Sequence, residues 1–313
     1  MQAIVINEYG DENKLVEKDL NLPPITENQV LVRVKSIGVN PIDWKTRKGL
    51  RQKRYPFQFF IVLGQEMSGI VENTGSSVLN FKKGDEVLGY GTPSNRGTYA
   101  QYFIIDANQL AHKPKNVSFP EAAGLGLTGT TAWEAIFEAG GLKAGETILI
   151  LAGSGGVGSM AIQLAKNIGA KVITTTSTRN VDYVKSLGAN EVIDYTKQDF
   201  AKEVSDVDIV FDTLGGQYQE KAFGVVKPGG RLISIVETIP NAAQYSQKND
   251  VFFNKINSHP ERPIIEKLAQ YAGDGILKVR IADQKKFNLQ NVKDIQKESE
   301  SGHVDGKLIL NIE

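Results

Sequence analysis

The sequence predicts an α/β protein with two parts, one rich in short β-strands and the other a doubly wound parallel sheet. Up to about residue 115, short apolar segments alternate with glycine and proline, and helical periodicity is scarce. After Ser118, apolar segments of strand length alternate with segments of helical period. The last apolar segment resembles the first part, so we expect the second part to be inserted into the first. The predicted boundaries are residues 1–117 with 264–313 for the first part and 118–263 for the second.

The first part is predicted to be a compact β domain, because its apolar segments are bounded by turn residues. Its expected strands are Ala3–Ile6, Gln29–Val39, Ile61–Glu72, Glu86–Tyr90 and Thr98–Ile105. Toward the C-terminus the pattern favours helices over Ile264–Ala272 and Val292–Ser299. A final strand is expected over Gly306–Leu310.

The second part opens with a capping box. Ser118 and Glu121 have the required spacing, and Pro120 fits the first turn of a helix that we expect to run to Trp133. The strands expected after it are Ile148–Ala152, Lys171–Thr175, Glu191–Tyr195, Val207–Asp212 and Arg231–Val236, with Val251–Phe253 as a candidate sixth. Right-handed crossovers would place a ligand at the carboxyl ends of these strands.

A glycine-rich turn follows the strand at Ile148–Ala152, with the sequence Gly153, Ser154, Gly155, Gly156, Val157, Gly158. Glycines occupy the three positions of G-x-G-x-x-G, between a strand and a helix. The first allows the sharp turn, the second lets a pyrophosphate approach the backbone, and the third lets helix and strand pack closely. Free N–H groups at the helix N-terminus would meet the phosphates. The stretch therefore predicts dinucleotide binding.

Composition narrows the function classes. Lys plus Arg and Asp plus Glu both number 36, so no net charge favours nucleic acid or a membrane surface as a partner. No apolar run approaches the roughly 20 residues of a membrane span, and the first residues lack a signal-peptide pattern. The chain contains no cysteine, which excludes Cys-ligated zinc and a cysteine nucleophile. We expect a cytoplasmic protein.

Several motifs in order resemble the zinc-independent quinone oxidoreductases of the medium-chain dehydrogenase/reductase superfamily, over essentially the whole chain. They are Gly38–Lys45, Leu63–Gly69, Ala122–Trp133, Ala152–Gly158, Leu187–Ala189, Phe211–Gly216 and Gly306–Lys307. The segment Asn40–Lys45 also resembles the enone and alkenal reductases. The resemblance implies a discontinuous, chaperonin-10-like catalytic domain, a Rossmann domain and NADPH-dependent reduction of quinones or α,β-unsaturated carbonyls. It also implies a homodimer joined through the edges of the Rossmann sheets.

The sequence departs from the zinc-dependent members of that superfamily. They carry a Cys near Asn40 and a His-Glu pair where Gln65 and Glu66 stand, and they have a four-cysteine lobe that is missing. A tetrahedral catalytic zinc site cannot be assembled from these positions. His112, His259 and His303 are far apart in the sequence, so we expect surface or loop residues and no metal ligand.

The choice of nicotinamide cofactor depends on the stretch Thr174–Asn180, about 20 residues after the glycines. NAD-binding folds place Asp or Glu there to bind the ribose 2′-OH, and this stretch has neither. Ser177 can donate a hydroxyl and Arg179 can bind a 2′-phosphate, which favours NADPH. Alternatively, the hydroxyls cap the next helix and Arg179 is solvated. Tyr195 matches a family position that contacts the adenosine phosphate, or it is a packed edge aromatic.

The resemblance also suggests residues for the reaction. Asn40 would lie beside the nicotinamide and donate through its amide to a developing enolate, unless it is only a turn residue before Pro41. Asp43 and Lys45 would form an ion pair that shapes the pocket, or Lys45 would donate directly, and Tyr55 could supply a phenolic proton. The family positions that contact the cofactor include Thr131, Leu214 and Val236.

Two further classes of function stay open. An enoyl-thioester reductase would use the same fold and a basic surface for its carrier, for which the candidates are Arg47, Lys48, Arg51, Lys53 and Arg54. A solvated basic loop explains these residues equally well. A protein without enzymatic activity, such as an NADPH-binding sensor, a structural protein or an RNA binder, is the other alternative. The absence of a concentrated basic face argues against RNA.

Overall fold

A computed structural model describes residues 1–312 and divides the chain into two compact units. Unit 1 comprises Met1–Leu127 and Pro260–Glu313, and unit 2 comprises Thr128–His259. The chain thus leaves unit 1, forms unit 2 and returns. The sequence placed the two crossings after residue 117 and before residue 264.

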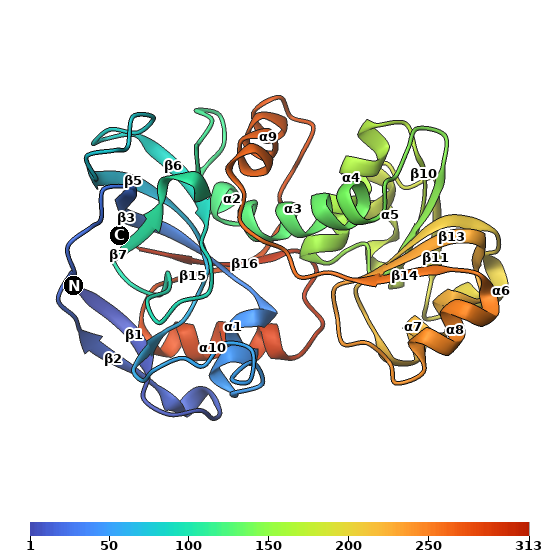
Figure 1. Ribbon diagram of the computed structural model, residues 1–313, viewed down its shortest axis with the longest axis horizontal. Coiled ribbons are helices and arrows are strands. Elements are labelled where there is room, and N and C mark those ends of the chain that lie inside the picture. Colours follow the sequence, from blue (N-terminus) through green and yellow to red (C-terminus); the bar gives the residue numbers. More distant parts are fainter. Residues whose placement is uncertain (313) are drawn as a thin grey trace. The chain divides into compact units, whose positions relative to one another are not determined.

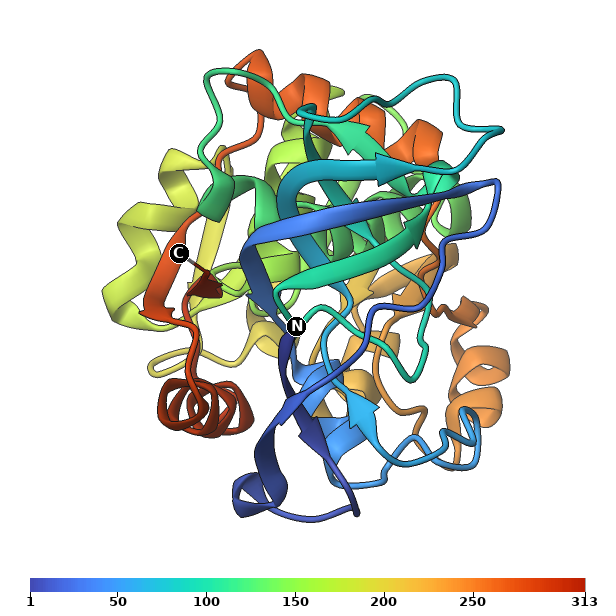
Figure 2. The ribbon, with the colours of Figure 1, turned by 90° about the vertical axis from the view of Figure 1, so that its left-hand side faces the viewer.

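Unit 1 is built on a seven-stranded sheet in which β3 (Gln29–Val39) is the central strand. The other strands are β5 (Glu66–Thr74), β6 (Glu86–Tyr90), β7 (Tyr102–Asp106), β8 (Leu110–His112), β15 (Ile281–Lys286) and β16 (Lys307–Asn311). The order is β15-β16-β3-β5-β6-β8, and β7 also pairs with β3 (Figure 2). β16 runs antiparallel to β3, with Leu308 opposite Val39, so the returning segment is part of the first sheet.

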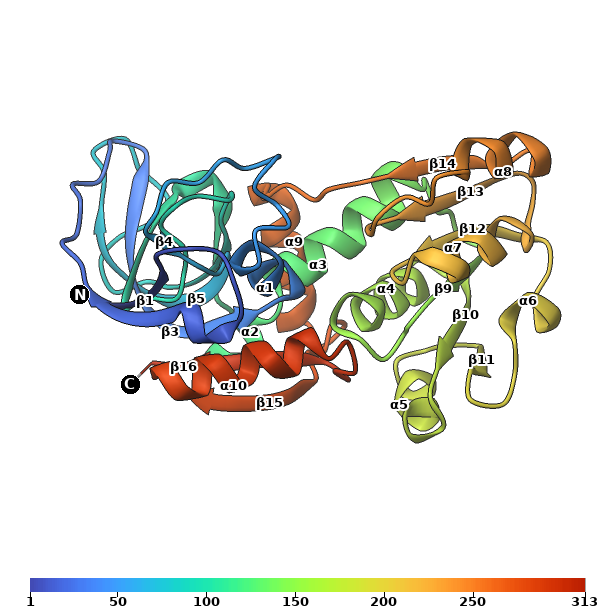
Figure 3. The same ribbon diagram turned by 90° about the horizontal axis from the view of Figure 1, so that it is seen from below.

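A smaller sheet and four helices complete unit 1. The small sheet has the order β2-β1-β4, with β1 (Gln2–Ile6), β2 (Leu15–Asp19) and β4 (Ile61–Val62). The helices are α1 (Pro41–Arg47), α2 (Phe119–Ala123), α9 (Arg262–Gly273) and α10 (Leu289–Glu300). α10 lies along β15 and buries Val292 and Ile295 in the same apolar core as the strands (Figure 3).

Unit 2 is built on a six-stranded sheet in which all neighbouring strands are parallel (Figure 1). Its strands are β9 (Thr147–Ile150), β10 (Lys171–Thr176), β11 (Glu191–Asp194), β12 (Val207–Asp212), β13 (Val226–Ser234) and β14 (Phe252–Lys255). The order β11-β10-β9-β12-β13-β14 reverses direction between β9 and β12. This is the order of a doubly wound dinucleotide-binding sheet, so the predicted fold class is confirmed.

The helices of unit 2 pack on this sheet. They are α4 (Gly156–Asn167), α5 (Val181–Ser186), α6 (Phe200–Glu203), α7 (Gly216–Phe223) and α8 (Ala242–Asn249). α4 and α5 contact β10, whereas α7 and α8 contact β13. The boundary between the units falls within α3 (Gly126–Trp133), which continues into a π-helix at Glu134–Ala139.

Several elements differ from the prediction, and backbone geometry explains two of them. The expected strand Ile61–Glu72 is split into β4 and β5, because Gly64 turns the chain with a φ of +88°. The expected helix from Ser118 to Trp133 is two helices, because Gly124 caps the first beside Lys307. The strand expected at Thr98–Ile105 begins only at Tyr102.

Other elements were not expected from the sequence. The sequence pattern gave no indication of α1, because Asn40-Pro41 reads as a turn. Asn40 is in fact the N-cap of a helix whose first residue is Pro41, a position that proline tolerates. In residues 1–312, no helix is long and apolar enough to cross a membrane.

Candidate functional site

The cofactor residues predicted in unit 2 follow the carboxyl ends of five parallel strands. The glycine turn follows β9, Ser177 and Arg179 follow β10, and Tyr195 follows β11. Leu214 follows β12, and Val236 follows β13. Because the strands are parallel, these five loops leave the same edge of the sheet. Residues as far apart in the sequence as Gly153 and Val236 are therefore gathered at one edge of the sheet.

The glycines of the turn differ in the space around them. A Cβ on Gly153 would lie 2.1 Å from Thr174 Oγ1, and one on Gly158 would lie 2.3 Å from the carbonyl oxygen of Ala152. Both positions are closed by the protein itself. A Cβ on Gly155 would meet only the Ala152 carbonyl oxygen, at 3.4 Å. Gly155 is also the N-cap of α4 and carries no capping side chain, so the first N–H groups of this helix can receive an anion.

The loop after β10 offers polar groups to a ligand. Ser177 begins a short 3-10 turn at Thr178–Asn180, and Arg179 is exposed. Asn180 is buried and donates from its side chain to Ser177 Oγ at 3.2 Å. At the end of β10 itself, the buried Thr176 hydroxyl has no hydrogen-bond partner within residues 1–312. Tyr195 is 55 % exposed, so it is not a packed aromatic at the edge.

A buried carboxylate shapes the loop after β12. Asp212 Oδ1 accepts hydrogen bonds from the backbone N–H groups of Leu214 and Gly215, both at 2.9 Å. Its Oδ2 accepts from the Gln219 side chain and from the Ser234 hydroxyl. Asp212 therefore links the ends of β12 and β13 and fixes the loop in which Leu214 is presented.

Two predicted residues lie elsewhere. Thr131 is in α3, and its buried hydroxyl is 2.9 Å from the hydroxyl of Ser258. Asn40 is in unit 1, where it caps α1 and is 2 % exposed. Thr131 and Asn40 therefore belong to different units.

In unit 1, Asn40 is held by a buried ion pair. The Lys307 ammonium donates to Asn40 Oδ1 at 2.6 Å and also pairs with Glu66 Oε1. The Asn40 amide nitrogen donates to Glu66 Oε1 at 2.9 Å and to the Gly38 carbonyl at 3.3 Å. Both amide hydrogens are thus engaged within the protein. In this arrangement neither is free for a substrate, so the predicted donation by Asn40 requires that one of these bonds be released.

Both oxygens of the Glu66 carboxylate also accept hydrogen bonds. Its Oε2 accepts from the backbone N–H of Leu127 at 2.7 Å, while Oε1 faces Lys307 and Asn40. Glu66 is fully buried and Lys307 is 3 % exposed, so solvent does not screen the interaction between their charges. Sequence reasoning did not assign a function to Lys307. The only signal was the dipeptide Gly306-Lys307 in a motif of the resemblance.

Asp43 continues this polar network. Its Oδ2 accepts from the backbone N–H of Asn40 at 2.9 Å, which completes the capping box, and from the Tyr99 hydroxyl at 3.1 Å. Burial raises the pKa of Asp43 to about 7, although both hydrogen bonds and the charge of Lys307 oppose the shift. Burial and the nearby Asp43 also raise the pKa of Tyr99 well above its ordinary value.

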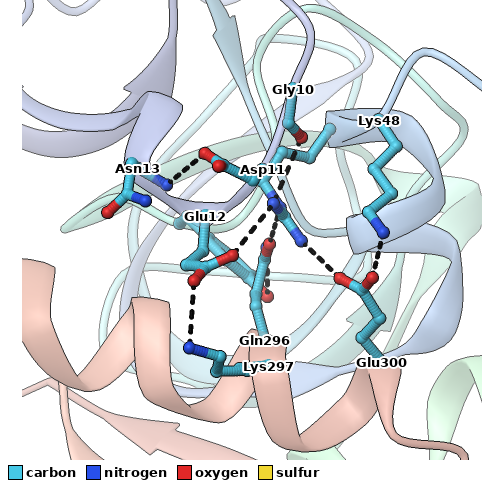
Figure 4. Close-up of polar contacts among 10 residues, drawn as sticks. Gly10, Asp11, Glu12, Asn13, Lys48, Gln296, Lys297 and Glu300 are labelled. Atoms are coloured by element: carbon cyan, nitrogen blue, oxygen red, sulfur yellow. Dashed lines mark hydrogen bonds and ion pairs between the residues drawn. The ribbon is translucent and has the colours of Figure 1, made fainter.

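The network ends at Arg47, whose guanidinium is fully buried. Gln296 contacts the Tyr99 hydroxyl with its amide and accepts from Arg47 Nε at 2.6 Å. The other guanidinium nitrogens reach Glu300 at 2.9 Å and Glu12 at 4.0 Å (Figure 4). Arg47 thus ties α1 to α10 and is not part of a solvated basic loop.

Other basic residues in and after α1 contact a carboxylate or an aromatic ring. Lys48 pairs with Glu300, as Figure 4 shows. The Arg51 and Arg54 guanidinium groups lie 4.5 and 5.5 Å from the centre of the Tyr55 ring, and Tyr55 stacks on Phe57. Lys45 is half-buried, with its ammonium 5.6 Å from the Trp44 ring centre.

The three histidines are exposed. His112 contacts the Asn80 carbonyl, and His303 contacts the Ser301 carbonyl. Within the described part of the chain, no group of three or more His, Cys, Asp or Glu side chains is arranged to hold a metal ion. The independence of zinc stays a prediction.

Comparison with protein families identifies both parts of the chain. Residues 26–115 match the alcohol dehydrogenase GroES-like domain, and residues 187–310 match a family described as zinc-binding dehydrogenase. Residues 129–215 match the C-terminal domain of the alanine dehydrogenase/PNT family. The expected chaperonin-10-like and Rossmann-type domains are confirmed.

Similar proteins cover nearly the whole chain. A 2-methylene-furan-3-one reductase of Solanum lycopersicum is 35 % identical over 99 % of this chain and 79 % of its own length. An NADPH-dependent alkenal/one oxidoreductase of Arabidopsis thaliana, described as chloroplastic, is 34 % identical with the same coverage. The structure of the quinone oxidoreductase from Coxiella burnetii superposes with a TM-score of 0.91 at 31 % identity, covering 100 % of this chain and 99 % of the other.

Loss of one partner of the buried ion pair should be strongly destabilising. We expect Lys307→Met to lower the free energy of unfolding by about 3–5 kcal/mol, because Glu66 would remain charged and buried without a cation. The double variant Glu66→Gln/Lys307→Met should recover most of that loss. As a control, Lys297→Met removes an exposed pair with Glu12 and should cost less than about 1 kcal/mol. Urea denaturation measures all four proteins, and a loss below about 1 kcal/mol for Lys307→Met would contradict the assignment.

Asp43 should make stability depend on pH. Because its folded pKa is raised to about 7, the folded protein holds a proton that the unfolded chain has lost above about pH 4. The contribution of this group is complete at acidic pH and is lost as the pH rises toward 7. Asp43→Asn keeps the capping acceptor and removes the titration. We expect the free energy of unfolding of the variant, relative to wild type, to improve by a few kcal/mol between pH 5 and pH 8. An identical difference at both pH values would disprove the raised pKa.

Proposed function

The chain belongs to the medium-chain dehydrogenase/reductase superfamily, and from this premise we propose that it is an NADPH-dependent reductase of α,β-unsaturated carbonyls or quinones. The observation that carries the proposal is the sheet edge of unit 2. There the open Cα of Gly155, the N-terminus of α4 and four further strand-end loops gather at the carboxyl ends of parallel strands. The relatives named as an alkenal/one oxidoreductase and a quinone oxidoreductase support this choice of substrates.

We propose that the cofactor is held by Gly153, Ser154, Gly155, Gly156, Val157 and Gly158 at its pyrophosphate. Ser177, Arg179 and Tyr195 would bind the adenosine end that carries the 2′-phosphate. Thr131, Leu214, Val236 and Asn40 complete the proposed set. A reduced nicotinamide supplies a hydride when it is bound, and the protein supplies position and electrostatics.

The catalytic set, Asn40, Asp43, Lys45 and Tyr55, divides by chemistry. Asn40 and Asp43 are buried and engaged, so we assign them the role of ordering the α1 N-terminus. Asp43 holds a proton on its carboxyl below about pH 7. Lys45 and Tyr55 are only half-buried and carry donors, so they are the better candidates to donate to a substrate oxygen.

We propose that the reaction does not need zinc. The chain has no cysteine, and the Glu66 carboxylate is paired with the Lys307 ammonium and accepts two N–H bonds. A metal ion bound to Glu66 would compete with the buried ammonium for the same negative charge.

Turnover and cofactor choice can be tested together. Wild type should oxidise NADPH with an enone or with 1,4-benzoquinone, should prefer NADPH to NADH, and should keep its activity after dialysis against EDTA. Arg179→Ala should weaken NADPH binding about 10- to 100-fold, through loss of a charged hydrogen bond, and leave NADH binding unchanged. Stopped-flow turnover and nicotinamide fluorescence measure these effects.

The outcomes separate the alternatives. Tight NADPH binding without turnover of any enone or quinone would identify a sensor or structural protein. Turnover confined to an enoyl thioester such as crotonyl-CoA would identify an enoyl-thioester reductase. Binding of neither NADPH nor NADH would end the proposal.

We also propose that the chain forms homodimers through the edge strand β14. Within residues 1–312, β14 pairs with β13 alone, and Phe252 on this strand is 57 % exposed. An unpaired edge strand with an exposed aromatic is suited to pairing with a second copy. Because the chain lacks cysteine, we further propose a reducing compartment, with the cytoplasm as the default.

A charge on the edge strand should disrupt the dimer. We expect wild type to elute as a dimer in size-exclusion chromatography with light scattering, and Phe252→Lys to elute as a monomer. Leu79→Lys is the matched control, since Leu79 is 90 % exposed and lies in unit 1. A monomeric wild type, or a Phe252→Lys variant that stays dimeric, would refute this interface.

A further inference from the structure

Asp194, the last residue of β11, connects two loops at the ligand edge of unit 2. Its Oδ2 accepts from the Thr178 hydroxyl at 2.5 Å and pairs with the Lys197 ammonium at 3.2 Å. Its Oδ1 accepts from the backbone N–H of Thr196 at 3.1 Å and from the Thr196 hydroxyl at 2.7 Å. The Thr178 and Thr196 hydroxyls are also 3.0 Å apart. One carboxylate therefore fastens the loop after β10 to the loop after β11.

Thr178, which donates to Asp194, lies next to residues that we propose bind the 2′-phosphate. Thr178 stands between Ser177 and Arg179, the two residues proposed for the 2′-phosphate, in a 3-10 turn that has only three residues. Tyr195, the third proposed residue, follows Asp194 directly and donates from its backbone N–H to the Thr176 carbonyl at 3.0 Å. All three side chains of the proposed phosphate site are thus within one residue of the Asp194–Thr178 contact.

These contacts are not explained by helix capping. The N-cap of α5 is Asn180, and the N-cap of the 3-10 turn is Ser177, so Asp194 caps neither. The Asp194 side chain is 10 % exposed even though Thr178 and Lys197 lie at the surface. The Thr178 and Thr196 hydrogen bonds hold the pKa of Asp194 far below its usual range, so it accepts bonds as a full anion at neutral pH.

The position of the charge also distinguishes this site from an NAD site. In NAD-binding sheets a carboxylate at the end of the second strand binds the ribose 2′-OH, and it would repel a 2′-phosphate. Here the carboxylate is one strand further along, at the end of β11, and its charge is compensated by Lys197 and two hydroxyls. It can order the loop without binding the ribose.

We propose that Asp194, acting through Thr178, is a positioning residue that sets the preference for a 2′-phosphorylated dinucleotide. The inference rests on the proposed NADPH-dependent function. Removal of the Asp194–Thr178 bond frees the 3-10 turn, so Ser177 and Arg179 must be ordered when the phosphate binds. Binding of NADH does not use these groups and is not affected.

The experiment compares variants that separate position from charge. Thr178→Val removes only the hydroxyl and leaves every charge in place, while Thr178→Ser restores the hydroxyl. Asp194→Asn removes the anion. Asp199→Asn is the matched control, because Asp199 also accepts a backbone N–H bond and pairs with a lysine, but it caps α6 and its lysine, Lys221, belongs to α7. The probes are NADPH, NADH, adenosine 2′,5′-bisphosphate and 5′-AMP, with binding followed by fluorescence or calorimetry.

We expect Thr178→Val and Asp194→Asn to bind NADPH and adenosine 2′,5′-bisphosphate about tenfold more weakly than wild type, or ~1.4 kcal/mol. Binding of NADH and 5′-AMP should change less than about twofold, and Thr178→Ser and Asp199→Asn should resemble wild type. The affinity for the 2′-phosphorylated ligands relative to that for NADH and 5′-AMP separates a positioning role from a general loss of structure. A general loss of structure would weaken binding of all four ligands.

Two results would overturn the inference, and they are distinguishable. If wild type prefers the 2′-phosphorylated ligands and Thr178→Val keeps that preference, Asp194 does not position the site, while the proposed function stands. If wild type shows no preference for a 2′-phosphate, both the NADPH assignment and this inference are wrong.

Discussion

The buried contact between Lys307 and Glu66 is the constraint around which unit 1 is organised. A charge that is removed from water is tolerable only with a partner and with hydrogen bonds for its remaining atoms. Lys307 belongs to the last strand, 241 positions after Glu66, and β16 can deliver it only by pairing with β3. The ammonium also donates to the side-chain Oδ1 of Asn40, the N-cap residue of α1. The pairing of β16 with β3, the ion pair between Lys307 and Glu66, and the N-cap of α1 therefore depend on one another.

Unit 2 uses carboxylates in a related way. Asp212 accepts four hydrogen bonds that join the ends of β12 and β13, and Asp194 accepts bonds that join the loops after β10 and β11. In each case an anion at a strand end satisfies donors that the loops would otherwise leave unpaired. The loops are thereby held in shape while the neighbouring side chains of Arg179 and Tyr195 are exposed.

The sequence predicts best what short-range patterns determine. The parallel sheet and the glycine turn follow from apolar runs and from glycine sterics, and the limits of β3, β6 and β12 match the expected strands. The cap of α1 was missed because Asn40-Pro41 is read equally well as a turn. The roles of Lys307 and Asp194 could not be read from the sequence, because each depends on which strand becomes its neighbour. Burial of Arg47 likewise follows from α10, which comes more than two hundred residues later.

The arrangement around Asn40 limits how a substrate oxygen could be stabilised. An amide with both hydrogens engaged stabilises new negative charge only if a bond of known cost is first broken. The bond to the Gly38 carbonyl, at 3.3 Å, is longer than the one to Glu66, at 2.9 Å, so it is the one that would yield. Loss of the bond to the Gly38 carbonyl would free one amide hydrogen of Asn40 and would leave the contact between Lys307 and Glu66 in place. A direct role of Asn40 is therefore compatible with the buried ion pair between Lys307 and Glu66.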